Sequence, residues 1–170
     1  MKLVKEFIPY VIIIAVVILI RTFIVTPVQV DGHSMDPTLK DHQILILNKW
    51  KKDYNRFDIV VIDDGEERLI KRIIGLPGET LEIKNNKLYI NGKYIKENFE
   101  HDKTDDFIYH NGEKIPNGYY FVMGDNRDNS KDSRFEEMNL EGHGAFSKKQ
   151  ILGVTNFSVF PFQTFGQIEA

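Results

Sequence analysis

The 170-residue sequence contains no cysteine. Disulfide bonds, thiolate nucleophiles and cysteine-based zinc or iron–sulfur sites are therefore excluded, so a hydrophobic core must hold any folded domain together. The sequence also has little excess charge, with a net charge of −3 and no run of five like charges. Nucleic-acid binding needs a basic face, so we expect no nucleic acid as a partner. The five histidines lack helical metal-site spacing, so we expect no metal and no cofactor.

Charge is absent from residues 7–20, FIPYVIIIAVVILI, and apolar residues resume after Arg21. A helix over about 19 residues rises ~28 Å, close to the ~30 Å hydrocarbon core of a bilayer, if Arg21 reaches the interface. Two alternatives are a cleaved signal peptide and a buried core helix. The first lacks small residues of the Ala-x-Ala kind, and the second would not be apolar on every side. We therefore predict a transmembrane signal-anchor over residues 7–26.

Basic residues near the apolar run predict its orientation. Lys2 and Lys5 precede the run, whereas after Arg21 the next basic residue is Lys40. The positive-inside rule then leaves residues 1–6 in the cytoplasm and residues 27–170 outside it. We expect a single-pass protein of the cell membrane with an extracytoplasmic domain.

Short runs rich in Ile, Val, Tyr and Phe alternate with turn residues after Pro27, which is typical of strands. Asn85-Asn86 and Asn91-Gly92 fit two-residue hairpin turns, because Asn and Gly tolerate positive φ. Residues from about 92 to 118 are polar and poorly patterned, so we predict a small subdomain or insertion there. We expect residues 157–162, FSVFPF, to be a core strand rather than a membrane-dipping surface. The predicted fold is all-β, a folded-sheet or barrel-like domain with hairpins behind one N-terminal helix.

Ser34 lies beside His33 in the segment DGHSMDPTLK, which raises the possibility of a Ser/His/Asp site. Adjacent residues of an extended chain point to opposite sides, so His33 is not placed to act as the base of Ser34. We interpret the other histidines as surface or packing residues, namely His42, His101, His110 and His143. Lys71 is a different candidate base, because burial in its apolar run would lower its pKa by about 3–5 units. A solvated lysine on an amphipathic strand is the alternative.

Four segments follow the apolar run in order: SMDPTL (34–39), RFDIVV (56–61), KRIIGLPGE (71–79) and GDNRDNSKDSR (124–134). They resemble the conserved boxes of bacterial type I signal peptidases, in the short single-span form of Gram-positive bacteria. The resemblance covers residues 7 to about 153. It implies a serine endopeptidase that removes signal peptides from exported preproteins and cuts after small residues. The expected partners are preprotein signal peptides, the lipid bilayer and the secretion machinery.

The resemblance also implies a role for individual residues. Ser34 would be the nucleophile, with its backbone N–H as an oxyanion donor, and Lys71 the general base. Ser130 would orient the lysine amine, and Met35 and Pro37 would shape the turn that presents Ser34. The supporting scaffold would comprise Arg72, Asp125, Arg127, Asp132 and Arg134.

The sequence departs from the family pattern at three places. Gly32 occupies the position where some members have a serine that donates to the oxyanion, and Phe57 replaces a common glycine. The link FEEMNLEGHGAF after Arg134 is longer and more acidic than usual. The rival functions are a self-cleaving Ser/Lys protein, a Ser/His/Asp hydrolase, and a non-catalytic or accessory membrane-tethered homologue that acts as a binding partner.

Overall fold

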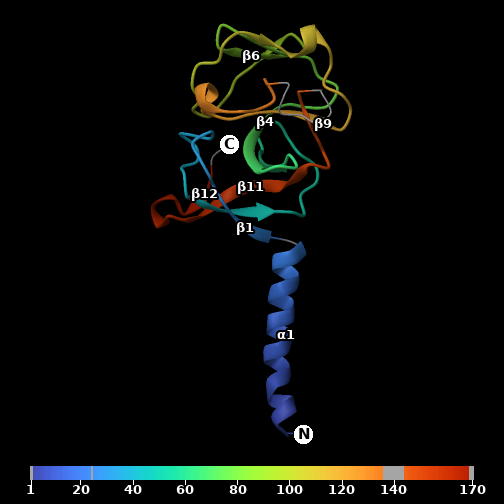
Figure 1. Ribbon diagram of the computed structural model, residues 1–170, viewed down its shortest axis with the longest axis vertical. Helices are drawn as coiled ribbons and strands as arrows, with labels where there is room; N and C mark the ends of the chain where they lie inside the picture. The colour runs from blue at the N-terminus through green and yellow to red at the C-terminus, as the bar shows by residue number, and fades with distance from the viewer. Residues whose placement is uncertain (1, 24, 136–143, 169–170) are drawn as a thin grey trace.

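The computed structural model describes residues 2–23, 25–135 and 144–168. Helix α1 (Lys2–Phe23) leads into a β domain and projects away from it (Figure 1). The helix begins five residues before the predicted anchor, and residue 24 of that anchor lies outside the described residues. Within the described part of the chain, no helix combines the length and hydropathy that a membrane crossing requires.

The larger of two antiparallel sheets has eight strands in the order β1-β2-β11-β3-β4-β9-β10, with β12 paired to β11. Its strands are β1 (Val25–Gln29), β2 (Ile44–Asn48), β3 (Ile59–Asp63), β4 (Arg68–Gly75), β9 (Tyr119–Met123), β10 (Phe146–Ser147), β11 (Ile151–Phe160) and β12 (Gly166–Gln167). The late strand β11 lies between the early strands β2 and β3. The C-terminal part of the chain therefore completes the sheet that carries the N-terminal motifs.

The smaller sheet has the strand order β7-β6-β5-β8. It contains β5 (Leu81–Lys84), β6 (Lys87–Ile90), β7 (Lys93–Ile95) and β8 (Phe107–Ile108). The two predicted hairpin turns are confirmed, because Asn85, Asn86, Asn91 and Gly92 all have positive φ. Strands β7 and β8, from the segment predicted as an insertion, thus join the same sheet as β5 and β6. The mostly β prediction is confirmed.

Strand β4 runs through the middle of the larger sheet, and every residue after Arg68 in it is buried. Ile70 packs into one hydrophobic cluster, with Met35 and Leu39, while Ile73 packs into another on the opposite face. Burying each of these side chains contributes about 1.5–3 kcal/mol relative to exposure. A polar side chain on this strand is therefore forced out of water, and Lys71 is such a residue.

The end of strand β11 corrects one prediction. Ser158 is buried, but Phe160 is 46% exposed and Phe162, in the short helix η4 (Phe162–Thr164), is 80% exposed. Phe165, just after that helix, is also exposed. The core interpretation of residues 157–162 is therefore wrong at its far end, because β11 ends at Phe160, still paired with Ile44 of β2, and the aromatic side chains there form an exposed tip.

Candidate active site

Ser34 and Lys71 meet in space although 37 residues separate them in sequence. Lys71 Nζ donates a hydrogen bond to Ser34 Oγ over 2.7 Å. This distance lies within the range that a general base needs to take a proton from a hydroxyl nucleophile. The rigid strand β4 supplies the amine, and the turn that follows Gly32 supplies the hydroxyl.

Burial makes the neutral, proton-accepting form of the Lys71 amine far more common than in a free lysine. Burial is the main cause and lowers the pKa of Lys71 from 10.5 to about 8, against an opposing effect of the carboxylates of Asp132 and Glu67. At pH 7 about one amine in ten is then neutral, compared with about one in three thousand for a free lysine. The solvated alternative for Lys71 is wrong, because its exposed fraction is 3%.

The backbone around Ser34 forms a compact turn. Met35 is buried, Asp36 N–H donates to the carbonyl of His33, and Leu39 N–H donates to the carbonyl of Met35. Gly32 has a φ of +87°, and its N–H donates to Asp41 Oδ1 over 2.9 Å. Because this N–H is already engaged, Gly32 offers no free backbone donor to an oxyanion, and a serine there would be strained.

Ser130 is buried beside the Ser34 turn, and its hydroxyl makes no hydrogen bond within the described residues. Both Ser130 Oγ and the carbonyl oxygen of Ser34 would lie 2.3 Å from a Cβ at Gly124. Sequence reasoning missed Gly124, whose lack of a side chain lets the three segments approach. The orienting contact from Ser130 to Lys71 stays a prediction.

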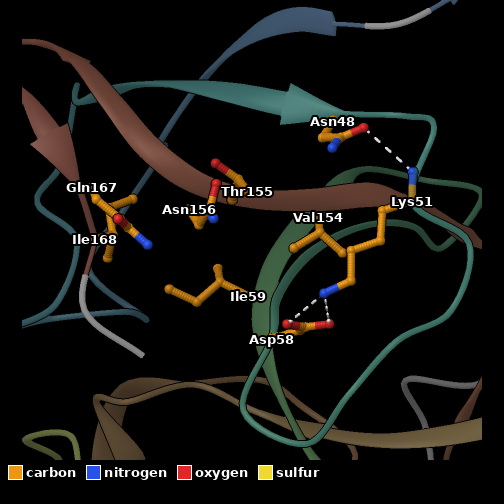
Figure 2. A pocket seen from close by; sticks show the side chains of 9 residues that line it. All are labelled: Asn48, Lys51, Asp58, Ile59, Val154, Thr155, Asn156, Gln167 and Ile168. Carbon is orange, nitrogen blue, oxygen red and sulfur yellow. Dashed lines mark hydrogen bonds and ion pairs between the residues drawn. The ribbon is translucent and has the colours of Figure 1, made fainter.

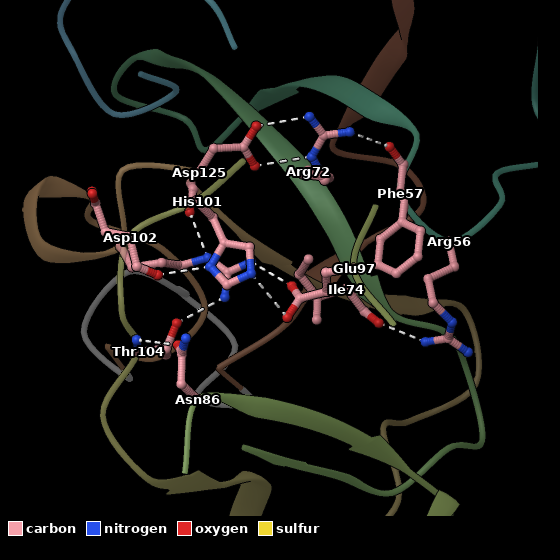
Figure 3. A network of polar contacts seen from close by, with 12 residues as sticks. Arg56, Phe57, Arg72, Ile74, Asn86, Glu97, His101, Asp102, Thr104 and Asp125 are labelled. Carbon is pink, nitrogen blue, oxygen red and sulfur yellow. Dashed lines mark hydrogen bonds and ion pairs between the residues drawn. The ribbon is translucent and has the colours of Figure 1, made fainter. Parts of the chain in front are cut away.

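Arg72 and Asp125 form a fully buried ion pair next to this site (Figure 3). Arg72 Nε and Nη2 donate to the two carboxylate oxygens over 2.9 and 2.7 Å, and Nη1 donates to the carbonyl of Phe57. The guanidinium also lies 3.9 Å from the ring centroid of Phe99, which packs on Phe57. Phe57 has a φ of +71°, a conformation that costs a bulky residue about 1–2 kcal/mol. Its ring packing and carbonyl contact explain how phenylalanine is tolerated where glycine is common.

The remaining predicted scaffold residues hold the loop after β9. Asp132 accepts a hydrogen bond from Gly124 N–H and is paired with Arg134, whose Nη2 also donates to the carbonyl of Arg127. Arg127 donates to the carbonyl of Gly124, to Thr104 Oγ1 and to Glu97. Glu97 was missed, because nothing in its local sequence indicates a partner 30 residues away.

Ser34 and Lys71 both line a groove of about 850 Å³. One wall is formed by residues 27–35 and the other by residues 67–71, and Asn129 and Lys131 also line it. Among the described residues, β1 pairs on one side alone, with β2. Residues 68–71 of β4 pair with β3, whereas the pairing of β4 with β9 starts at Arg72. The groove therefore lies between two free strand edges.

A second cavity, of about 430 Å³, contains none of the predicted site residues (Figure 2). Lys51 Nζ bridges both carboxylate oxygens of Asp58 at its wall. This pairing leaves no base beside a nucleophile, so the chemistry points to the groove at Ser34.

The side chains of His33 and His101 do not act as the base of Ser34, because each has another partner. His33 Nδ1 lies 3.0 Å from Asp36 Oδ2 rather than at Ser34, and His101 contacts Glu97. His143 lies outside the described residues, as do residues 136–143 of the long link. No cluster of three potential metal ligands occurs among the residues that the structure describes.

Comparisons with known proteins identify the family of the chain. The family described as signal peptidase, peptidase S26 matches residues 3–160. Signal peptidase I of Bacillus amyloliquefaciens is 46% identical over 167 residues, covering 89% of this chain and 85% of that protein. Signal peptidase I S of Bacillus subtilis (strain 168) is 46% identical over 165 residues, covering 89% and 86%. The crystal structure of a signal peptidase I from Enterococcus faecalis V583 is 34% identical with a TM-score of 0.50, covering 60% of this chain and 96% of that one. The chain belongs to the S26 family of signal peptidases.

Proposed function

We propose that the chain is a signal peptidase I that removes signal peptides from exported preproteins, with Ser34 as nucleophile and Lys71 as general base. The 2.7 Å contact between Lys71 Nζ and Ser34 Oγ carries this proposal. Neutral Lys71 takes the hydroxyl proton as Ser34 Oγ attacks the scissile carbonyl, and the oxyanion accepts a hydrogen bond from Ser34 N–H. The proton passes to the leaving amine, which leaves an acyl-enzyme. Lys71 then deprotonates a water, which hydrolyses the ester and frees Ser34.

The groove supports the assignment of an extended peptide as substrate. A chain lying between β1 and residues 68–71 of β4 can hydrogen-bond to free strand edges, as in β-strand addition. Ile70, from the β4 wall, and Val30, from the opposite wall, give the groove an apolar lining beside Ser34 and Lys71. We expect small residues one and three positions before the scissile bond. No observation favours the non-catalytic alternative, because both reacting residues are present and in contact.

Replacement of Ser34 tests the proposed reaction. We expect Ser34→Ala to lower the rate of preprotein cleavage by about 10³-fold or more, because no other group can form the acyl-enzyme. The measurement is gel analysis of a preprotein incubated with the full chain in detergent. Ser147→Ala, in β10, removes a hydroxyl whose partner is Gln150 and serves as the matched control. Cleavage by Ser34→Ala at the wild-type rate would contradict the mechanism.

We also propose that α1 anchors the protein in the cell membrane, with the N-terminus cytoplasmic and the β domain outside. Two features support this. The side chains from Phe7 to Val17 are exposed along a helix that stands clear of the β domain (Figure 1). The aromatic tip formed by Phe160, Phe162 and Phe165 is a second exposed apolar surface. The secretion machinery would then deliver preproteins to the same face of the membrane.

Two charges placed in the apolar run test the anchor. We expect Ile13→Lys with Val17→Lys to stop the full chain from floating with lipid vesicles, because each lysine costs about 2.5–3.5 kcal/mol at a bilayer centre. Tyr94→Lys with Ile108→Lys adds the same charge on exposed positions of the β domain and should leave flotation unchanged. Flotation of both double variants would overturn the anchor. Digestion of the β domain by protease added outside intact cells measures the orientation.

A further inference from the structure

Asn126 joins the Ser34 turn to the loop that carries Ser130. Its side-chain Nδ2 donates to the carbonyl of His33 over 3.0 Å, and its backbone N–H donates to the carbonyl of Ser34 over 3.1 Å. Its Oδ1 accepts from Asn129 N–H over 3.2 Å, at the start of the short helix η2 (Arg127–Asn129). The two partners are of opposite kinds, an acceptor and a donor, so the orientation of the amide is fixed.

The carbonyl of His33 belongs to the same planar peptide group as the N–H of Ser34. Fixing the direction of that carbonyl therefore fixes the direction of the N–H, the proposed oxyanion donor. The carbonyl also accepts from Asp36 N–H over 3.1 Å, so Asn126 provides its second hydrogen bond. Two hydrogen bonds on a peptide oxygen polarise the group and make its N–H a stronger donor.

We propose that Asn126 is a positioning residue that orients and polarises the His33–Ser34 peptide, so that the Ser34 N–H can stabilise the oxyanion. This inference rests on the proposed function of Ser34. It also addresses the oxyanion site itself, because Gly32 has no side chain and its N–H is bound to Asp41. Because Gly32 cannot donate a hydrogen bond to the oxyanion, stabilisation of the transition state depends more strongly on the direction of the Ser34 N–H.

Two substitutions of Asn126 test its two side-chain hydrogen bonds, to His33 and to Asn129, one at a time and together. Asn126→Asp keeps the Oδ1 acceptor for Asn129 but loses the donor to His33, whereas Asn126→Ala loses both. Neither removes the backbone hydrogen bond to Ser34. We expect both to lower kcat about tenfold with KM nearly unchanged, less than the 10²–10³-fold of a deleted oxyanion donor because the N–H remains. Rates are compared above the pKa of Lys71, where the amine is neutral in each variant.

The affinity for a peptide aldehyde distinguishes a positioning role of Asn126 from a purely structural one, which would leave that affinity unchanged. The aldehyde forms a tetrahedral adduct with Ser34, so its affinity should fall about tenfold in both variants, in step with kcat, while binding of an uncleavable peptide stays unchanged. If Asn126→Asp retains wild-type kcat and aldehyde affinity, the amide acts through Asn129 alone and the inference is overturned. Activity retained by Ser34→Ala would instead overturn the proposed function. As a control, the melting temperatures of both variants are compared with that of the wild type to check that the fold persists.

Discussion

Lys71→Met should abolish preprotein cleavage, by about 10³-fold or more, while making the folded protein more stable at pH 7. The loss follows because Lys71 is the one base in contact with Ser34 Oγ among the described residues. The gain follows from the pKa, which burial lowers from 10.5 to about 8. Below pH 8 the lysine is protonated in both folded and unfolded chains, so the folded state bears the cost of a buried charge. That cost is at most about 3 kcal/mol.

The lowered pKa of Lys71 predicts how both the stability of the fold and the rate of cleavage depend on pH. Between pH 8 and 10.5 the unfolded chain binds a proton at Lys71 that the folded chain does not, so wild-type stability relative to Lys71→Met rises across that window. Cleavage by the wild type should rise about tenfold per pH unit below 8 and level off above it. Denaturant unfolding and initial rates from pH 5 to 10 measure both. Lys84→Met, an exposed lysine on β5, is the control. Activity that is flat from pH 5 to 9 would contradict a lysine base.

Asp125→Ala should destabilise the fold by about 3–5 kcal/mol, because it leaves the guanidinium of Arg72 buried without its carboxylate. The melting temperature should fall by about 10 °C in a chain of this size. Activity should fall as well, since Arg72 adjoins Lys71 and Asp125 lies between Gly124 and Asn126. Thermal unfolding followed by circular dichroism measures the first effect.

A double variant that removes both Arg72 and Asp125 distinguishes the stability lost with the ion pair from the stability lost by burying an unpaired charge. We expect Arg72→Met with Asp125→Ala to be more stable than Asp125→Ala alone, because no unpaired charge remains. Lys148→Ala is the surface control: its Nζ lies 3.8 Å from Asp53 in solvent, and it should change little. A melting temperature for Asp125→Ala equal to that of the wild type would show that the buried pair contributes little to stability.

The sequence was sufficient to predict features that depend on local conformation. Asn85, Asn86 and Asn91 predicted hairpin turns because few other residues tolerate positive φ, and the alternating Ile/Val runs predicted strands. The pairing of Ser34 with Lys71 came from resemblance, since a lysine in a strand does not by itself reveal which face is buried. Glu97, Gly124 and Asn126 escaped prediction because their roles depend on contacts between distant segments. The exposed aromatic tip was misjudged because its composition alone is that of a core strand.

The groove between β1 and β4 has a consequence for the behaviour of the protein at high concentration. Free strand edges that can receive a substrate can equally receive any extended chain, including a segment of a second copy or of an unfolded neighbour. Pro27 in β1 lacks a backbone N–H, and Glu67 and Arg68 place exposed charges at the β4 edge. These residues discourage continuous edge-to-edge pairing with another sheet. We expect these edges, where the proposed substrate would bind, also to be the place where copies of the protein associate at high concentration.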